Sequence, residues 1–157
     1  MNYVELVQAI QPGSKLFVKG TTYTVKQHIV WMQHRANSPY DKWVLVDSNG
    51  NEGFRFFIEA PESAIGFAQI FHYDFKEPMP EELEFEGKKY KQVCGEFCTA
   101  IKVEGEEVYK EGDGEIWWDY ACVDNDKEGL SLGRNWETWE REDLKTYVLE
   151  MSDVSLM

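Results

Sequence analysis

The chain has 157 residues, of which 43% are hydrophobic and 15% aromatic, and its formal net charge is −13. This length favours a single domain over residues 1–157, and the hydrophobic content excludes a largely disordered chain. The acidic composition disfavours direct nucleic-acid binding. No apolar run approaches the roughly 20 residues that a membrane-spanning helix needs, so membrane insertion is not expected.

The N-terminal residues predict a short helix followed by strands. Val4, Val7 and Ile10 lie three positions apart and would share one face of a helix. Residues 16–33 are rich in branched and aromatic side chains, which favour the extended conformation, and Gly20 divides them into two strands. The chain therefore starts with a helix of one or two turns and then becomes a β structure.

A hairpin and a further strand are predicted next. Residues 43–46 and 54–58 read as two strands around Asn49-Gly50, a strong signal for a two-residue turn. Residues 60–63 interrupt the pattern. Beyond them apolar residues alternate with polar ones, as in a half-buried strand whose inner side would carry Ile65, Phe67, Phe71, Tyr73 and Phe75.

The second half of the sequence repeats features of the first half. LEFEGKKYK, from Leu83 to Lys91, follows the same template as LFVKGTTYT, from Leu16 to Thr24, 67 positions earlier. The segments WVLVDSNGNEGFRF and YACVDNDKEGLSL also match, although the offset grows to 77 and then 76, which predicts a longer central hairpin in the second copy. This self-similarity predicts an internal duplication.

The predicted fold is therefore all-β and mainly antiparallel, a sandwich or partly open barrel made of two similar half-units. The repeats would cover residues 14–75 and 81–142, with the Pro-rich and acidic segment 76–82 between them. Short helices are expected at the termini. At the C-terminus a strand through Glu142 followed by a short helix reconciles the two periodicities of residues 136–151.

Several short motifs follow one another along the chain: Pro12-Gly13, Gly20 with Tyr23, Trp43 to Asp47, Gly87 with Tyr90, Gly95-Glu96-Phe97, Gly112-Asp113, Asp119-Tyr120 and Leu130-Ser131. Their order resembles that of the bacterial domain-of-unknown-function family 4178. The resemblance covers about residues 12–142 and implies an all-β module without known catalytic residues. This chain departs from the family pattern at Cys98-Thr99 and at Leu132-Gly133.

No motif for catalysis or cofactor binding is recognisable in the sequence. HExxH, GxSxG and phosphate-binding glycine loops are absent, so an enzyme is the less favoured interpretation and no cofactor is expected. Cys94, Cys98 and Cys122 are interpreted as small apolar residues rather than zinc ligands. The oxygen-rich segment with Asp124, Asp126 and Glu128 is a weak candidate for a metal site and is more typical of a hairpin turn.

The pair Trp117-Trp118 is the strongest candidate for a binding site. Adjacent residues of a strand point to opposite faces, so one indole would fill the core and the other would need a different cover. Glu96, Glu115 and Asp119 lie among these aromatic residues in the predicted strands. Rings surrounded by acids suit a protein partner or a cationic ligand such as a polyamine, and a carboxylate beside an indole could also act as an acid.

The leading hypothesis is thus a non-catalytic binding or adaptor module with an acidic aromatic surface. The alternatives are an acidic mimic of nucleic acid that inhibits a DNA-binding protein, and an uncharacterised enzyme. The first residues contain an acid and no basic residue, unlike a secretory signal, and three cysteines cannot all pair within the chain. A cytoplasmic location is therefore expected.

Overall fold

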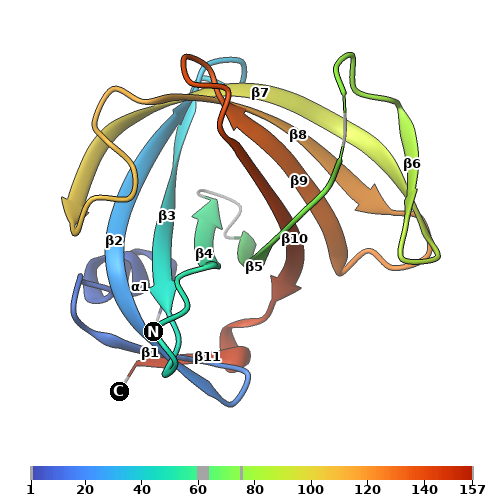
Figure 1. The fold of residues 1–157 in the computed structure, drawn as a ribbon. Helices are drawn as coiled ribbons and strands as arrows, with labels where there is room; N and C mark the ends of the chain where they lie inside the picture. Colours follow the sequence, from blue (N-terminus) through green and yellow to red (C-terminus); the bar gives the residue numbers. More distant parts are fainter. Residues whose placement is uncertain (1, 60–63, 75, 157) are drawn as a thin grey trace.

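The described residues form a closed barrel of eight antiparallel strands, carrying three further strands and one short α-helix (Figure 1). The computed structural model describes residues 2–59, 64–74 and 76–156, so the predictions for residues 60–63 and Phe75 lie outside it. The elements are α1 (Tyr3–Ala9), β1 (Lys15–Val18), β2 (Thr21–Gln33), β3 (Ser38–Val46), β4 (Phe54–Glu59), β5 (Ala64–Phe71), β6 (Glu82–Phe85), β7 (Lys88–Gly105), β8 (Gly114–Cys122), β9 (Glu128–Asn135), β10 (Arg141–Leu149), a 3-10 turn (Met151–Asp153) and β11 (Val154–Leu156).

The barrel closes through pairings between strands that are distant in sequence. Its hydrogen-bonded order is β2-β3-β4-β5-β10-β9-β8-β7, and β7 pairs back with β2. The all-β antiparallel prediction is confirmed, but the fold is a closed barrel rather than a sandwich or a partly open barrel. Closure is possible because β2 and β7 have 13 and 18 residues, so each is long enough to pair with three neighbours. Among the described residues, no helix has the length and apolarity needed to span a bilayer.

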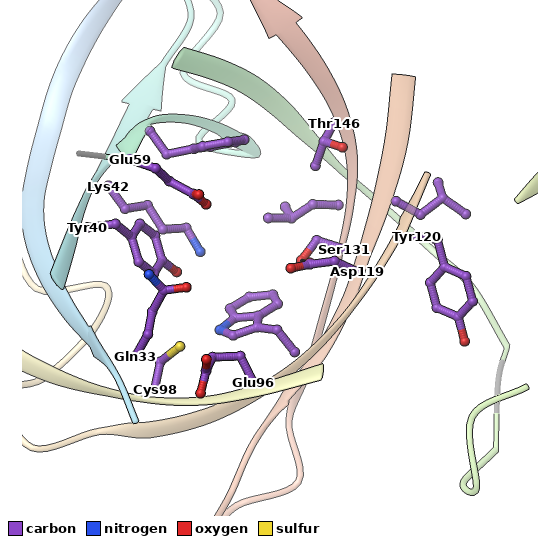
Figure 2. A pocket seen from close by; sticks show the side chains of 14 residues that line it. Gln33, Tyr40, Lys42, Glu59, Glu96, Cys98, Asp119, Tyr120, Ser131 and Thr146 are labelled. Carbon is purple, nitrogen blue, oxygen red and sulfur yellow. Dashed lines mark hydrogen bonds between the residues drawn. The ribbon is translucent and has the colours of Figure 1, made fainter. Parts of the chain in front are cut away.

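The interior of the barrel is partly filled by rings that lie on glycines. A Cβ on Gly133 would be 2.3 Å from the ring of Trp117, and one on Gly66 would be 2.3 Å from the ring of Phe57. The β7–β8 loop inserts Tyr109, whose backbone N–H and C=O are both hydrogen-bonded by the side chain of Gln27. Beside this packed region lies a cavity (Figure 2). The inner cluster consists of Ile29, Trp31, Val44, Ala68, Cys98, Ala100, Tyr109, Trp117 and Leu144.

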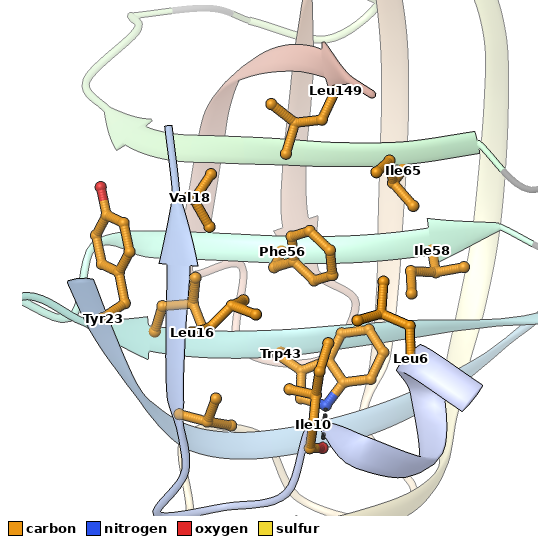
Figure 3. Packing of buried hydrophobic residues seen from close by; sticks show 12 residues of the cluster. Leu6, Ile10, Leu16, Val18, Tyr23, Trp43, Phe56, Ile58, Ile65 and Leu149 are labelled. Atoms are coloured by element: carbon orange, nitrogen blue, oxygen red, sulfur yellow. Dashed lines mark hydrogen bonds between the residues drawn. The ribbon is translucent and has the colours of Figure 1, made fainter. Parts of the chain in front are cut away.

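Two further clusters cover the outside of the barrel wall. In the first, α1 and β1 pack over β3, β4 and β5 (Figure 3), and the indole N–H of Trp43 donates to the carbonyl of Ile10 over 3.0 Å. The N-terminal helix was predicted, but its buried face carries Leu6 and Ile10 while Val4 is 66% exposed. The second outer cluster contains Tyr90, Tyr120, Cys122, Leu130 and Leu132, with Leu83 and Phe85 of β6 against it.

The C-terminal helix predicted after Glu142 is wrong. Residues Arg141–Leu149 form β10, which pairs with β5 on one edge and with β9 on the other. Trp136 and Trp139 are 53% and 61% exposed in the turn before it, so their helical spacing reflects no buried helix face. Backbone hydrogen bonds along both edges stabilise β10, and they outweigh the helix-like spacing of its apolar residues.

Candidate functional site

A cavity of about 200 Å³ lies inside the barrel and is lined by residues from six of its strands and from the end of β2. It is located toward the end at which β2 ends and β3 begins, which we call the mouth. The side chain of Tyr120 points away from this space and belongs to the second outer cluster (Figure 2). The other lining residues are Gln33, Tyr40, Lys42, Phe57, Glu59, Glu96, Cys98, Trp117, Asp119, Leu130, Ser131, Leu144 and Thr146.

Three carboxylates from three different strands surround this cavity. Glu59 ends β4, Glu96 comes from β7 and Asp119 from β8 (Figure 2). Asp119 accepts hydrogen bonds from the hydroxyl of Ser131 over 2.7 Å and from the thiol of Cys94 over 3.3 Å, and burial raises its pKa. The cavity therefore combines a high density of negative charge with limited access to water.

Glu96 is held in place by the turn between β2 and β3. Its two carboxylate oxygens accept the backbone N–H groups of Arg35 over 2.6 Å and of Ala36 over 3.1 Å. The turn thereby orients the carboxylate at the mouth, since two backbone donors restrict its rotation. A carboxylate oriented in this way can still accept a further hydrogen bond, because each of its oxygens has two lone pairs.

A buried charge cluster lies deeper in the barrel and consists of Lys42, Arg55, Tyr109 and Glu142. Lys42 Nζ is 3.2 Å from Glu142 Oε2, Arg55 Nη2 is 2.8 Å from Glu142 Oε1, and the Tyr109 hydroxyl donates to the same carboxylate. Burial alone would raise the pKa of Glu142, but the neighbouring Lys42 and Arg55 lower it to about 2. Glu142 is therefore ionised at neutral pH and balances two buried cations.

The ammonium group of Lys42 also lies against three aromatic rings. Its Nζ is 4.3 Å from the ring centroid of Trp117, 5.1 Å from that of Tyr109 and 5.8 Å from that of Trp31. These distances are typical of cation–π contacts. Burial lowers the pKa of Lys42, and Glu142 opposes that effect. The indole of Trp117 thus already contacts a cation of the same chain.

The predicted site residues divide into two groups in the structure. Trp117, Glu96 and Asp119 line the cavity together. Glu115 is buried two residues before Trp117 along β8, where burial and the nearby Glu142 raise its pKa to about 7. Trp118 lies on the opposite face of β8 and packs against the second outer cluster, so the two indoles do not share a surface. The expectation that they point to opposite faces is confirmed.

Sequence reasoning missed the cations and acids that point into the barrel. Lys42, Arg55 and Glu142 were not singled out, and neither was Glu59. A signal was present, since Lys42 stands on the same parity as the buried Val44 in the apolar segment KWVLV, and Arg55 stands between two phenylalanines in FRFFIE. A charged residue at such a position must be paired inside the fold, and this marks an interior polar site.

The weak candidates for a metal site are not brought together. Asp124 and Asp126 are exposed in the β8–β9 loop, and Glu128 forms an ion pair with Lys88 at 2.5 Å. Asn125 Oδ1 accepts the N–H of Lys127 over 2.9 Å, which is the geometry of an Asx turn. Across residues 2–59, 64–74 and 76–156, no group of three or more His, Cys, Asp or Glu side chains could hold a metal ion.

The cysteines have no features of reactive thiols. Cys98 and Cys122 are buried, as expected of small apolar residues, whereas Cys94 is exposed. Burial raises the pKa of Cys98 to about 12, and partial desolvation of the thiol with the adjacent Asp119 raises the pKa of Cys94 to about 12. Both groups are thiols rather than nucleophilic thiolates at neutral pH.

Comparisons with known proteins identify no relative of this chain. No protein-family model matches it, and neither a curated protein nor a solved structure shows significant similarity. The chemistry of the cavity is therefore the basis on which function can be inferred.

Proposed function

We propose that the protein is a non-catalytic binding module that takes a small organic ammonium compound into the barrel cavity. The observation that carries this proposal is the convergence of Glu59, Glu96 and Asp119 on one cavity that also has aromatic walls. The same convergence of carboxylates on a cavity, with the raised pKa of Glu115, also supports the alternative of an uncharacterised enzyme, whereas the nucleic-acid mimic has no specific observation in its favour among the described residues. The cytoplasmic location and the resemblance to family 4178 stay predictions from the sequence.

Electrostatics and burial both favour an ammonium ligand. The net charge of −13 attracts cations from solution, and the low-dielectric walls of the cavity concentrate the field of its carboxylates. Asp119 has a raised pKa because it is desolvated, so a bound cation would stabilise its ionised form. Tyr40 and Phe57 supply rings that can cover the apolar part of the ligand.

The size of the cavity favours a small molecule over a protein segment. Drug-sized ligands occupy pockets of about 300–1,000 Å³, and this cavity measures about 200 Å³. A short alkylamine matches that space, and its two ends can meet polar groups on different strands.

Isothermal titration calorimetry with short ammonium compounds tests the proposal. We expect 1,4-diaminobutane or 4-aminobutanoate to bind with one-to-one stoichiometry, and 1-butanol not to bind. Asp119→Asn should weaken binding at least about tenfold and Glu59→Gln should weaken it less, because Glu59 is exposed. Glu111→Gln, an exposed acid in the β7–β8 loop, is the matched control. Absence of binding by both compounds, or binding that Asp119→Asn leaves unchanged, would contradict the proposal.

We also propose that the barrel consists of two similar half-units, β1–β5 and β6–β10. The turns after β1 and β6 both have two consecutive positive φ angles, and the β-bulges of β2 and β7 fall at matching positions. Cross-strand partners match too, since Leu16 pairs with Tyr23 and Leu83 with Tyr90. The matched positions, each 67 apart, are Lys19 and Glu86, Gly20 and Gly87, and Lys26 and Val93.

Both strand seams between the halves have a register that an approximate two-fold axis would produce. Met32 pairs with Thr99, 67 positions later, at the β2–β7 seam. At the β5–β10 seam Phe71 pairs with Asp143, and Phe67 pairs with Tyr147. Phe71 and Tyr147 are 76 positions apart, and so are Phe67 and Asp143, so each pair is the counterpart of the other under that offset.

The second half alone should therefore pair with a second copy of itself. We expect residues 76–150 carrying Glu142→Gln to form a folded dimer in light scattering. The substitution is included because the partners of Glu142, Lys42 and Arg55, are absent from this segment. A folded or unfolded monomer would contradict the proposal.

A further inference from the structure

We propose that the ligand of the cavity is zwitterionic, with its carboxylate on Lys42 and its ammonium group on the carboxylates at the mouth. This inference rests on the proposed function and narrows its ligand class to short ω-amino acids. It follows from the donors of Lys42, from the charge balance around it, and from the arrangement of acids across the cavity.

The ammonium group of Lys42 makes a hydrogen bond to Glu142, and its other contacts are with the faces of aromatic rings. An ammonium carries three N–H donors, and Glu142 Oε2, at 3.2 Å, is the hydrogen-bond acceptor that Lys42 has among the described residues. The side chain is 3% exposed, lines the cavity, and extends its amine into the space between the walls (Figure 2). Bulk water does not reach such a donor freely, so an acceptor inside the cavity would stabilise it.

Within the buried charge cluster, cations outnumber carboxylates. Lys42 and Arg55 share the single carboxylate of Glu142, and both cations are buried. Glu115 and Asp119 also interact with Lys42; burial raises the pKa of Glu115 to about 7, and burial raises the pKa of Asp119 as well. A buried unbalanced cation is costly, so an anionic group of a ligand would be favoured at this position.

The opposite charge lies toward the mouth. Glu59 and Glu96 are placed there by the end of β4 and by the β2–β3 turn, and Asp119 faces the same cavity from β8. A diamine would meet repulsion from Lys42, and a dicarboxylate would meet repulsion from the three acids. A molecule with one charge of each sign, joined by a short alkyl chain, satisfies both ends and packs its chain against Tyr40 and Phe57.

Three probes of equal chain length test this assignment by calorimetry: 4-aminobutanoate, 1,4-diaminobutane and succinate. We expect 4-aminobutanoate to bind at least about tenfold more tightly than either of the others. Lys42→Met should remove that preference by weakening 4-aminobutanoate without weakening 1,4-diaminobutane. Lys102→Met, at a lysine whose side chain is 64% exposed, is the matched control and should change nothing.

The outcomes separate this inference from the proposed function. If 1,4-diaminobutane binds as tightly as 4-aminobutanoate and Asp119→Asn weakens both, the ammonium site stands and the zwitterion assignment is wrong. If succinate binds best, or if none of the three binds, both are wrong. A readout independent of variant folding is the ¹⁵N resonance of Lys42 Nζ in the unmodified protein, which should shift with 4-aminobutanoate and stay unchanged with 1-aminobutane.

Discussion

Neutralising Glu142 should strongly destabilise the barrel, because this residue balances two buried cations. Glu142→Gln preserves the size of the side chain but leaves Lys42 and Arg55 without a counter-charge. Removing one partner of a buried ion pair costs about 3–5 kcal/mol. The pKa gives a similar magnitude, since a fall from 4.5 to about 2 corresponds to roughly 3 kcal/mol at about 1.4 kcal/mol per pH unit.

Urea unfolding followed by tryptophan fluorescence measures this loss directly. In thermal unfolding, the same loss of free energy should lower the midpoint temperature of a chain of this length by about 10 °C. Because the folded-state pKa of Glu142 lies below its unfolded value, its stabilisation is complete above pH 4.5 and is lost as the pH falls toward 2. The difference between the unmodified protein and Glu142→Gln should therefore shrink below pH 4.5. It should also decrease as the pH rises through 7, because the charge of Glu142 helps to raise the pKa of Glu115 and the variant lacks that charge.

A surface ion pair provides the control for this experiment. Glu86 is 56% exposed and pairs with Lys145, so Glu86→Gln should cost less than about 1 kcal/mol. In the double variant Lys42→Met/Glu142→Gln one unbalanced cation is removed, so it should be more stable than Glu142→Gln alone. A loss below about 1 kcal/mol in Glu142→Gln, or strict additivity in the double variant, would refute the reasoning.

Three further predictions concern the residues around the cavity. Glu115→Gln should stabilise the protein by about 1–3 kcal/mol at pH 8 and leave its stability unchanged at pH 4. The folded-state pKa of Glu115 is raised, so ionising this carboxyl in the folded protein lowers stability increasingly as the pH rises from 4.5 through 7. Gly133→Ala should lower the free energy of unfolding in urea by about 1–3 kcal/mol and weaken ligand binding in calorimetry, because the added Cβ would displace Trp117. Gly95→Ala is the control: its added Cβ would have no neighbour closer than 3.5 Å, so stability and binding should stay unchanged. Tyr109→Phe should cost about 1.5–3 kcal/mol in the same unfolding assay, since the hydroxyl donates to a charged group.

The strands and the turns could be predicted because their signals are local. Branched and aromatic composition located β2, and alternation located β5. Asn49-Gly50 located the loop between β3 and β4, where the carboxylate of Asp47 accepts two backbone N–H groups. The residue-by-residue alignment of the proposed half-units could not be predicted. The sequence aligns Trp43 with Tyr120, but Trp43 faces Phe56 and Trp118 faces Leu132, so the strand register places β8 two residues away from that alignment.

The barrel closure and the site depend on contacts between distant segments, which no local pattern contains. The β2–β7 and β5–β10 seams both join residues about 70–80 positions apart, and both are needed to make one side of the strands an interior. Lys42 and Glu142, 100 positions apart, become partners for the same reason. Local patterns could have marked each as a charged residue on a buried side, but they could not have shown that the two charges meet.

If the two half-units share an origin, the interior is where they have diverged. With the offsets of the strand register, Lys42 corresponds to Trp117 and Arg55 to Ser131, while Glu142 corresponds to Gly66. The first half thus supplies both buried cations, and the second half supplies the anion and the ring beneath Lys42. Two identical halves would place like charges together inside the barrel, at a cost that no contact would offset. Under the proposed duplication, a buried site with opposite charges at its two ends would require the interiors of the two half-units to differ, while their outer clusters could stay alike.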